Sequence, residues 1–213
     1  MARRPIIQVL AGVNGAGKSS IGGAQFRKAG VDWFNPDAAA KSAMAELGLN
    51  QEEANGWAWT KGFDLLRRAI ATKQNFAFET TLGGNSIAAA LNEAAASHDI
   101  RIWFCGLASP ELHIARVKLR VVAGGHDIPE AKIRERWIGS RMNLIQLLPH
   151  LAALKVYDNS QSVPAGEKIP MPTLLLAFGK GGIVTPDRND MQALNAIPTW
   201  AKPIVQAAFE RFP

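Results

Sequence analysis

Cysteine is almost missing from this sequence: Cys105 is the only one in a chain of 213 residues. A single cysteine excludes a disulfide framework and any metal site built from several thiolates. Cys105 also lies within the apolar run 102–107, where a buried, unreactive thiol is much more common than a nucleophile. We therefore expect a protein of a reducing compartment in which this thiol is inert.

Long apolar runs are missing too. No stretch approaches the roughly 20 apolar residues that a helix needs to cross a bilayer. The apolar run that follows Arg3 and Arg4 is too short for the core of a signal peptide, and it lacks a cleavage site. The sequence thus predicts a cytoplasmic protein without a membrane partner.

What is present is the composition of a globular protein, with 47% hydrophobic and 20% charged residues. The length suits one α/β domain with a core of its own. The net charge is +6, and residues 101–141 hold eight basic side chains against four acidic ones. A nucleic-acid surface would explain this excess, but a pocket for a polyanionic nucleotide also gathers lysine and arginine. We expect a bound nucleotide, rather than nucleic acid, to account for this basic excess.

Residues 12–19 fit the pattern G-x-x-x-x-G-K-[ST], the phosphate-binding loop of kinases and nucleotide triphosphatases. Glycines let the backbone curl so that successive N–H groups point at phosphate oxygens. The lysine reaches the β- and γ-phosphates, and the hydroxyl of the last residue can bind Mg²⁺, here through Ser19. The residues expected to contact ATP are Gly12, Asn14, Gly15, Ala16, Gly17, Lys18, Ser19 and Ser20.

The neighbouring segments support this interpretation. The apolar run 6–11 is typical of a buried parallel strand, and a helix can follow from Ser19 onward. A glycine-rich turn with an incidental lysine is the alternative. A dinucleotide fingerprint would need glycine at position 20, where Ser20 stands.

The remaining pattern alternates strands and helices, which predicts parallel strands joined by right-handed crossovers. We expect a three-layer α/β fold of the P-loop type: a mostly parallel five-stranded sheet, helices on both faces, and a small C-terminal hairpin and helix. It would form one domain, with a lid at about 116–141 and a C-terminal appendage at about 161–213. Strands are expected at 6–11, 31–34, 76–78, 100–107 and 155–157, a loop at 161–172, a hairpin at 173–184 and helices at 38–49, 51–73, 85–97, 110–122, 130–148 and 198–212.

Polar side chains follow two of the expected strands. Asp37 comes after the strand 31–34, and Glu79, Thr80 and Thr81 follow 76–78. Ligands bind at the carboxyl edge of open α/β sheets, so these residues and the phosphate loop should lie close together. Asp37 is the candidate base for an acceptor hydroxyl, or else a helix N-cap. The other three could bind substrate hydroxyls or hold Mg²⁺ through water, or else form a turn.

Arginines surround a predicted hinge. Two glycines, a proline and the residues between them (124–129) separate two basic helices. Arg120, with Arg134 or Arg136, could close over a triphosphate, although any one of them could instead lie on a solvated helix face. Asp158 could be structural or contact the nucleotide. His98, His113 and His150 receive no role.

Taken together, these motifs resemble the zeta-toxin family of P-loop kinases, especially its chromosomal zeta-like branch. The similarity extends over about residues 6–160. The segments that carry it are AGVNGAGKSS at 11–20, NPD at 35–37, ETTL at 79–82, GLASPEL at 106–112, RVVAGGHDIP at 120–129 and YDNS at 157–160.

This resemblance implies an ATP- and Mg²⁺-dependent kinase acting on a sugar hydroxyl. In the toxins proper the acceptor is UDP-N-acetylglucosamine, phosphorylated on the 3′-hydroxyl of its amino sugar. Lys18 would bind phosphates, Asp37 would be the base, Glu79 and Thr81 would contact the sugar nucleotide, and Arg120 would be a lid arginine.

One position departs from the family. The toxins carry a second lid arginine just before the proline, and His126 is the nearest match here. A neutral imidazole lacks the charge and the fork geometry of guanidinium. Either Arg134 or Arg136 takes over, or transfer is slower. The alternative function is an ATP-binding module with little turnover of its own, held by a protein partner such as an antitoxin.

Overall fold

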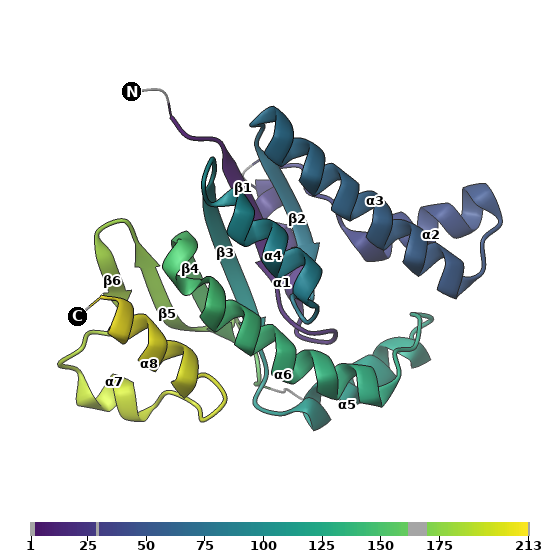
Figure 1. Cartoon of the computed structure of the whole chain (residues 1–213). Helices are drawn as coiled ribbons and strands as arrows, with labels where there is room; N and C mark the ends of the chain where they lie inside the picture. The colour runs from purple at the N-terminus through teal and green to yellow at the C-terminus, as the bar shows by residue number, and fades with distance from the viewer. Residues whose placement is uncertain (1–2, 29, 162–169, 213) are drawn as a thin grey trace.

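The structure is a computed structural model, and it describes residues 3–28, 30–161 and 170–212. A six-stranded sheet runs through it in the order β2-β1-β3-β4-β5-β6 (Figure 1). The first four of these strands pair in parallel, and the last two are antiparallel. Their bounds are β1 Ile6–Ala11, β2 Phe76–Thr80, β3 Asp99–Gly106, β4 Leu151–Asp158, β5 Thr173–Gly179 and β6 Gly182–Thr185.

Helices cover both faces of the sheet. Helices α3, α4, α6 and α8 pack side by side in one layer, whereas α1 packs on β1 and β3 from the other side (Figure 1). Within the described ranges no helix is both long and apolar enough to cross a membrane. The helices are α1 Lys18–Lys28, α2 Pro36–Leu47, α3 Gln51–Thr72, α4 Asn85–Ala94, α5 Pro110–Val122, α6 Glu130–Leu147, the short 3-10 helix η1 Leu148–His150, α7 Met191–Asn195 and α8 Lys202–Arg211.

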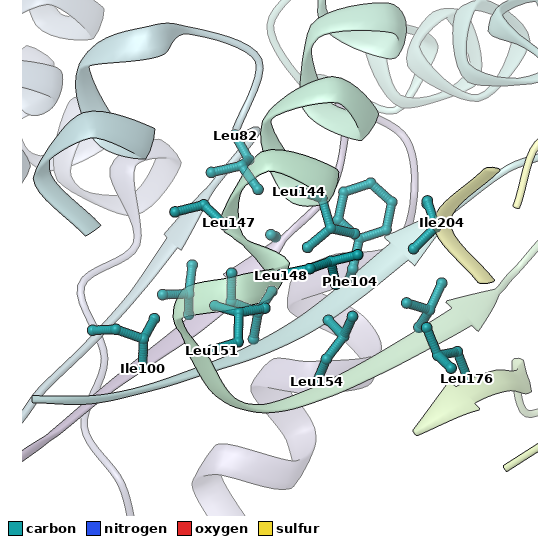
Figure 2. Close-up of a cluster of buried hydrophobic side chains, with 14 of the residues drawn as sticks. Leu82, Ile100, Phe104, Leu144, Leu147, Leu148, Leu151, Leu154, Leu176 and Ile204 are labelled. Atoms are coloured by element: carbon teal, nitrogen blue, oxygen red, sulfur yellow. The ribbon is translucent and has the colours of Figure 1, made fainter. Parts of the chain in front are cut away.

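The main core lies between the sheet and the layer of α4, α6 and α8. Leu144 and Leu147 at the end of α6, and Leu148 at the start of η1, lie over side chains of β3 and β4, and Ile204 of α8 closes the cluster (Figure 2). Each such buried side chain contributes roughly 1.5–3 kcal/mol through loss of apolar surface to water. This packing holds the sheet rigid beneath the loops at its carboxyl edge.

The predicted fold class is confirmed, with one difference in the number of strands. The expected strand at 31–34 is only a single bridge, in which Phe34 pairs with Phe78 beyond the edge strand β2. The pairing stops there because α2 begins at Pro36. The expected hairpin at 173–184 instead joins the sheet, since β5 pairs with β4 and buries Leu175 and Leu176.

The C-terminal segment also differs in detail. The last helix begins at Lys202 rather than 198, and the short helix α7 precedes it. Trp200 lies between them, buried against Gly106, where an added Cβ would come within 2.2 Å of the indole ring. Most of the loop expected at 161–172 lies outside the described residues.

Candidate active site

The phosphate loop leaves β1 and enters α1 as predicted, and its glycines have the conformations that this path requires. Gly12, Gly15 and Gly17 have φ angles of 139°, 81° and 81°. A Cβ on Gly12 would lie 2.1 Å from the carbonyl oxygen of Cys105. Only glycine fits there, because the loop passes directly over β3.

Three side chains hold the loop from outside. His113 of α5 donates through Nδ1 to the carbonyl oxygen of Asn14 at 2.8 Å, and Asn159 donates to that of Ala16 at 2.9 Å. Arg136 of α6 donates to Oδ1 of Asn14 at 2.8 Å. Burial lowers the pKa of His113 to about 4, so the imidazole is neutral and carries its proton on Nδ1.

Sequence reasoning missed two of these supports. His113 gave no local signal, because an isolated histidine on a helix is uninformative without its neighbours. Asn159 follows β4, and its position after a strand was the one indication that it could reach the ligand edge.

A buried carboxylate lies beside the end of the loop that carries Lys18. Glu79, at the end of β2, is 7% exposed, and its Oε1 lies 3.6 Å from Nζ of Lys18. The hydroxyl of Ser19 lies 3.0 and 2.9 Å from the two carboxylate oxygens. The amide of Asn35 donates to Oε2 at 3.1 Å. A buried carboxylate needs such partners, since an unpaired buried charge is strongly destabilising.

Asp37 lines the same cavity as Glu79. The side chain that caps α2 is that of Asn35, which accepts from the N–H of Ala38, so the alternative role of Asp37 as N-cap is excluded. The Asp37 carboxylate is half exposed. Its Oδ2 lies 3.4 Å from Nη1 of Arg120, and its Oδ1 lies 4.0 Å from Nε2 of His126. The carboxylate is thus free of the helix end and faces the segment 116–141.

The three candidate arginines separate into two groups. Arg120 and Arg136 reach the site, through Asp37 and Asn14 respectively. Arg134 instead forms an exposed ion pair with Glu111 at 2.6 Å and does not line the cavity beside the loop. Burial lowers the pKa of Arg136, and the neighbouring carboxylates of Glu135 and Asp37 partly offset this. Of the two arginines left open by the sequence, Arg136 is the one placed at the phosphate loop.

A cavity of about 330 Å³ lies beside the phosphate loop. Asp37, Glu79 and Arg136 line it, together with Thr80 and Thr81. The two threonine hydroxyls accept hydrogen bonds from the N–H groups of Leu82 and Gly83, at 3.0 and 3.4 Å. Each hydroxyl can still donate its own proton to a ligand. Further lining comes from Asn14, His126, Lys132 and an aromatic wall of Phe34, Trp59 and Phe63.

Four of the eight basic residues in the segment 101–141 lie within ion-pair distance of a carboxylate in the described part of the chain. Lys118 pairs with Glu130 at 2.7 Å, and Lys132 pairs with Glu135 at 2.9 Å. Arg141 stacks on the ring of Trp137 instead, with 3.5 Å between its guanidinium carbon and the ring centroid.

No protein-family model matches the chain. An uncharacterised protein of Haemophilus influenzae is 31% identical over 133 residues, which cover 59% of this chain and 88% of that protein.

Several solved structures share the fold. The AvrRxo1-ORF1:-ORF2 structure with ATP has a TM-score of 0.60 at 15% identity, covering 84% of this chain and 60% of that one. The PezAT toxin-antitoxin structure of Streptococcus pneumoniae has a TM-score of 0.57 at 15% identity, covering 99% and 86%. A provisionally assigned kinase of Chloroflexus aurantiacus has a TM-score of 0.51 at 14% identity, covering 65% and 80%. The chain therefore belongs to the same family as the Haemophilus influenzae protein, and its fold is that of the zeta-toxin-like P-loop kinases.

Proposed function

We propose that this protein is an ATP-dependent kinase that transfers the γ-phosphate of ATP to a hydroxyl of a small molecule. The observation that carries the proposal is a cavity that is lined by Asn14 of the phosphate loop, by Arg136 and by the carboxylates of Asp37 and Glu79. Phosphoryl transfer needs a phosphate cradle, cationic groups for the charge on the γ-phosphate and a carboxylate for the acceptor hydroxyl. Asn14, Arg136 and the two carboxylates line this cavity, and Lys18 lies beside it, 3.6 Å from Glu79.

Each group has a definite task in this reaction. The loop N–H groups and Lys18 bind the triphosphate, and Asp37 accepts the proton of the attacking hydroxyl. As the new bond between that oxygen and the γ-phosphorus forms, the bond to the oxygen of ADP breaks. Arg136 and Arg120 balance the charge of the transferring group, and residues 116–141 act as the lid that carries them. Glu79, Thr80 and Thr81 orient the acceptor through its other polar groups.

The residues beside the loop also suit Mg²⁺, a cation that prefers oxygen ligands. The Ser19 hydroxyl and the Glu79 carboxylate lie in contact, 2.9 Å apart at their closest, and offer such oxygens next to the phosphate position. Mg²⁺, when bound there with ATP, neutralises phosphate charge. Ser19 would hold it directly and Glu79 directly or through water.

The acceptor class that we infer is a sugar nucleotide such as UDP-N-acetylglucosamine. Its support is the family resemblance together with a cavity that combines hydroxyl-binding side chains with an aromatic wall. Incubating the purified protein with radiolabelled ATP and a panel of sugar nucleotides and free sugars tests both the kinase activity and the acceptor class. Labelled product from any acceptor supports the kinase, and its identity decides the class.

Two variants separate binding from transfer. Lys18→Ala should abolish transfer, because it removes the charge on the β- and γ-phosphates. Asp37→Ala should still bind ATP in calorimetry but transfer no phosphate. Full transfer by Asp37→Ala would remove this carboxylate as the base.

A second candidate function is an ATP-binding module controlled by a protein partner such as an antitoxin. The observation that favours it is the ion pair between Asp37 and Arg120. In the chain without a partner, this ion pair occupies the carboxylate that is expected to act as the base. The PezAT structure is that of a toxin-antitoxin system, which makes a partner of this kind a reasonable candidate. Tight ATP binding without labelled product, across the whole panel, would favour this function over the first.

A further inference from the structure

The side chain of Asn35 occupies a junction between the two halves of the proposed site. It lies between Phe34, which pairs with the edge strand β2, and Pro36, the first residue of α2. The N–H of Phe34 donates to Ala77, and the carbonyl of Phe34 accepts from the N–H of Glu79, both at 2.9 Å. This pairing fixes Asn35 beside Glu79, although the two are far apart in the sequence.

The two ends of the Asn35 amide have different partners. Oδ1 accepts from the backbone N–H of Ala38 at 3.1 Å, which caps α2. Nδ2 donates to Oε2 of Glu79 at 3.1 Å. The N–H of Ala38 and the Glu79 carboxylate allow only this orientation of the amide. In the flipped orientation the amide NH₂ would face the N–H of Ala38, and the amide oxygen would face the carboxylate.

Each contact controls one functional carboxylate. The cap fixes the first turn of α2, and Asp37 lies in that turn. The second contact completes the partners of Glu79. Its Oε1 faces Lys18 and Ser19, whereas its Oε2 faces Ser19 and the Asn35 amide. Without Nδ2, that oxygen keeps only the rotatable Ser19 hydroxyl, and the carboxylate can swing toward Lys18.

We propose that Asn35 is a positioning residue that holds the proton-accepting Asp37 and the phosphate-side Glu79 in one fixed frame. The inference rests on the proposed kinase function, since it concerns the geometry needed for transfer. Asn35 does not itself line the cavity, and it acts through the two carboxylates.

The test uses the near equivalence of asparagine, aspartate and serine as helix caps. Asn35→Ser keeps an oxygen for the N–H of Ala38 but removes the separate amide group that donates to Glu79. Asn35→Asp keeps the cap and turns a second carboxylate oxygen toward Glu79. If Asn35 served only as a cap, both variants would behave like wild type. Since a hydrogen bond to a charged group is at stake, we expect kcat to fall roughly 10- to 100-fold in Asn35→Ser and further in Asn35→Asp.

Asn50 offers a matched control. It caps α3 in the same way, accepting from the N–H groups of Glu52 and Glu53, and it does not line the cavity. Asn50→Ser should leave kcat unchanged. Circular dichroism checks that all three variants are folded, and calorimetry should find that the Kd for ATP changes less than kcat does.

The outcomes are distinct. Wild-type kcat in both Asn35 variants would overturn the positioning role and leave the kinase proposal intact. An equal fall in Asn50→Ser would also overturn it, because the effect would then belong to capping in general. Absence of transfer by the wild-type protein would overturn the kinase proposal and this inference with it.

Discussion

Replacing Arg136 by alanine should nearly abolish phosphoryl transfer, whereas the same change at Arg134 should leave it almost intact. Both residues belong to α6, but only Arg136 reaches the phosphate loop, through its hydrogen bond of 2.8 Å to Oδ1 of Asn14. The Arg134 guanidinium pairs with Glu111 on the surface, with about half of its side chain exposed. The pair of variants therefore compares two identical deletions on one helix.

The expected size follows from the role. An arginine that neutralises a transferring phosphoryl group contributes a factor of about 10³ or more to kcat. This corresponds to roughly 4 kcal/mol of transition-state stabilisation. Arg136→Lys should recover only part of the loss, because an ammonium group cannot reproduce the fork of guanidinium. The exposed pair of Arg134 contributes little to stability in water, so Arg134→Ala should also stay folded.

The assay is single-turnover transfer from radiolabelled ATP at saturating acceptor, with calorimetric ATP binding measured in parallel. A loss of kcat in Arg134→Ala equal to that in Arg136→Ala would refute the assignment. A loss of ATP affinity in Arg136→Ala that accounts for the whole effect would instead make this arginine a support of the loop.

The remaining predictions concern packing and pH. Gly139→Ala would bring a Cβ within 2.5 Å of the Gly83 carbonyl oxygen and displace the turn after Thr81, so the KM for the acceptor should rise. Gly56→Ala on α3 meets nothing within 4 Å and should stabilise the protein to urea by about 0.5–1 kcal/mol. Burial lowers the pKa of His113 from 6.5 to about 4. As the pH falls below 6.5, the imidazole is therefore protonated in the unfolded chain but stays neutral in the folded one. Wild type should therefore lose up to about 3 kcal/mol relative to His113→Gln between pH 6.5 and 4, and an equal loss in both proteins would contradict this.

The parts of the site that the sequence could predict are those coded by local pattern and sheet topology. The phosphate loop is a contiguous motif between a strand and a helix. Asp37 and Glu79 could be placed at the same edge because parallel strands present their carboxyl ends together. The two carboxylates do line one cavity, even though the strand expected before Asp37 is a single bridge at Phe34. One pair of backbone hydrogen bonds was enough to align it.

The choice between Arg134 and Arg136 could not be made from the sequence. Two residues apart on a helix means a rotation of about 200°, so their side chains point to nearly opposite sides. The sequence could show that only one of them faces the site, but not which one. The answer depends on how α6 packs on the turn after β2, where Gly139 lies against Gly83 and Asn143 donates to the carbonyl of Leu82. Those contacts exist only in the folded chain.

The same packing links the phosphate loop to the segment 116–141. Asn14 is held through its carbonyl by His113 of α5 and through its side chain by Arg136 of α6. The segment 116–141 consists of the end of α5, the connection 123–129 and the first part of α6. A shift of either helix must therefore alter contacts at the phosphate loop. Arg120, which like His113 belongs to α5, contacts Asp37. Because α5 and α6 contact both the phosphate loop and Asp37, a substitution at His126, which lies between these helices, should change the rate of the proposed transfer.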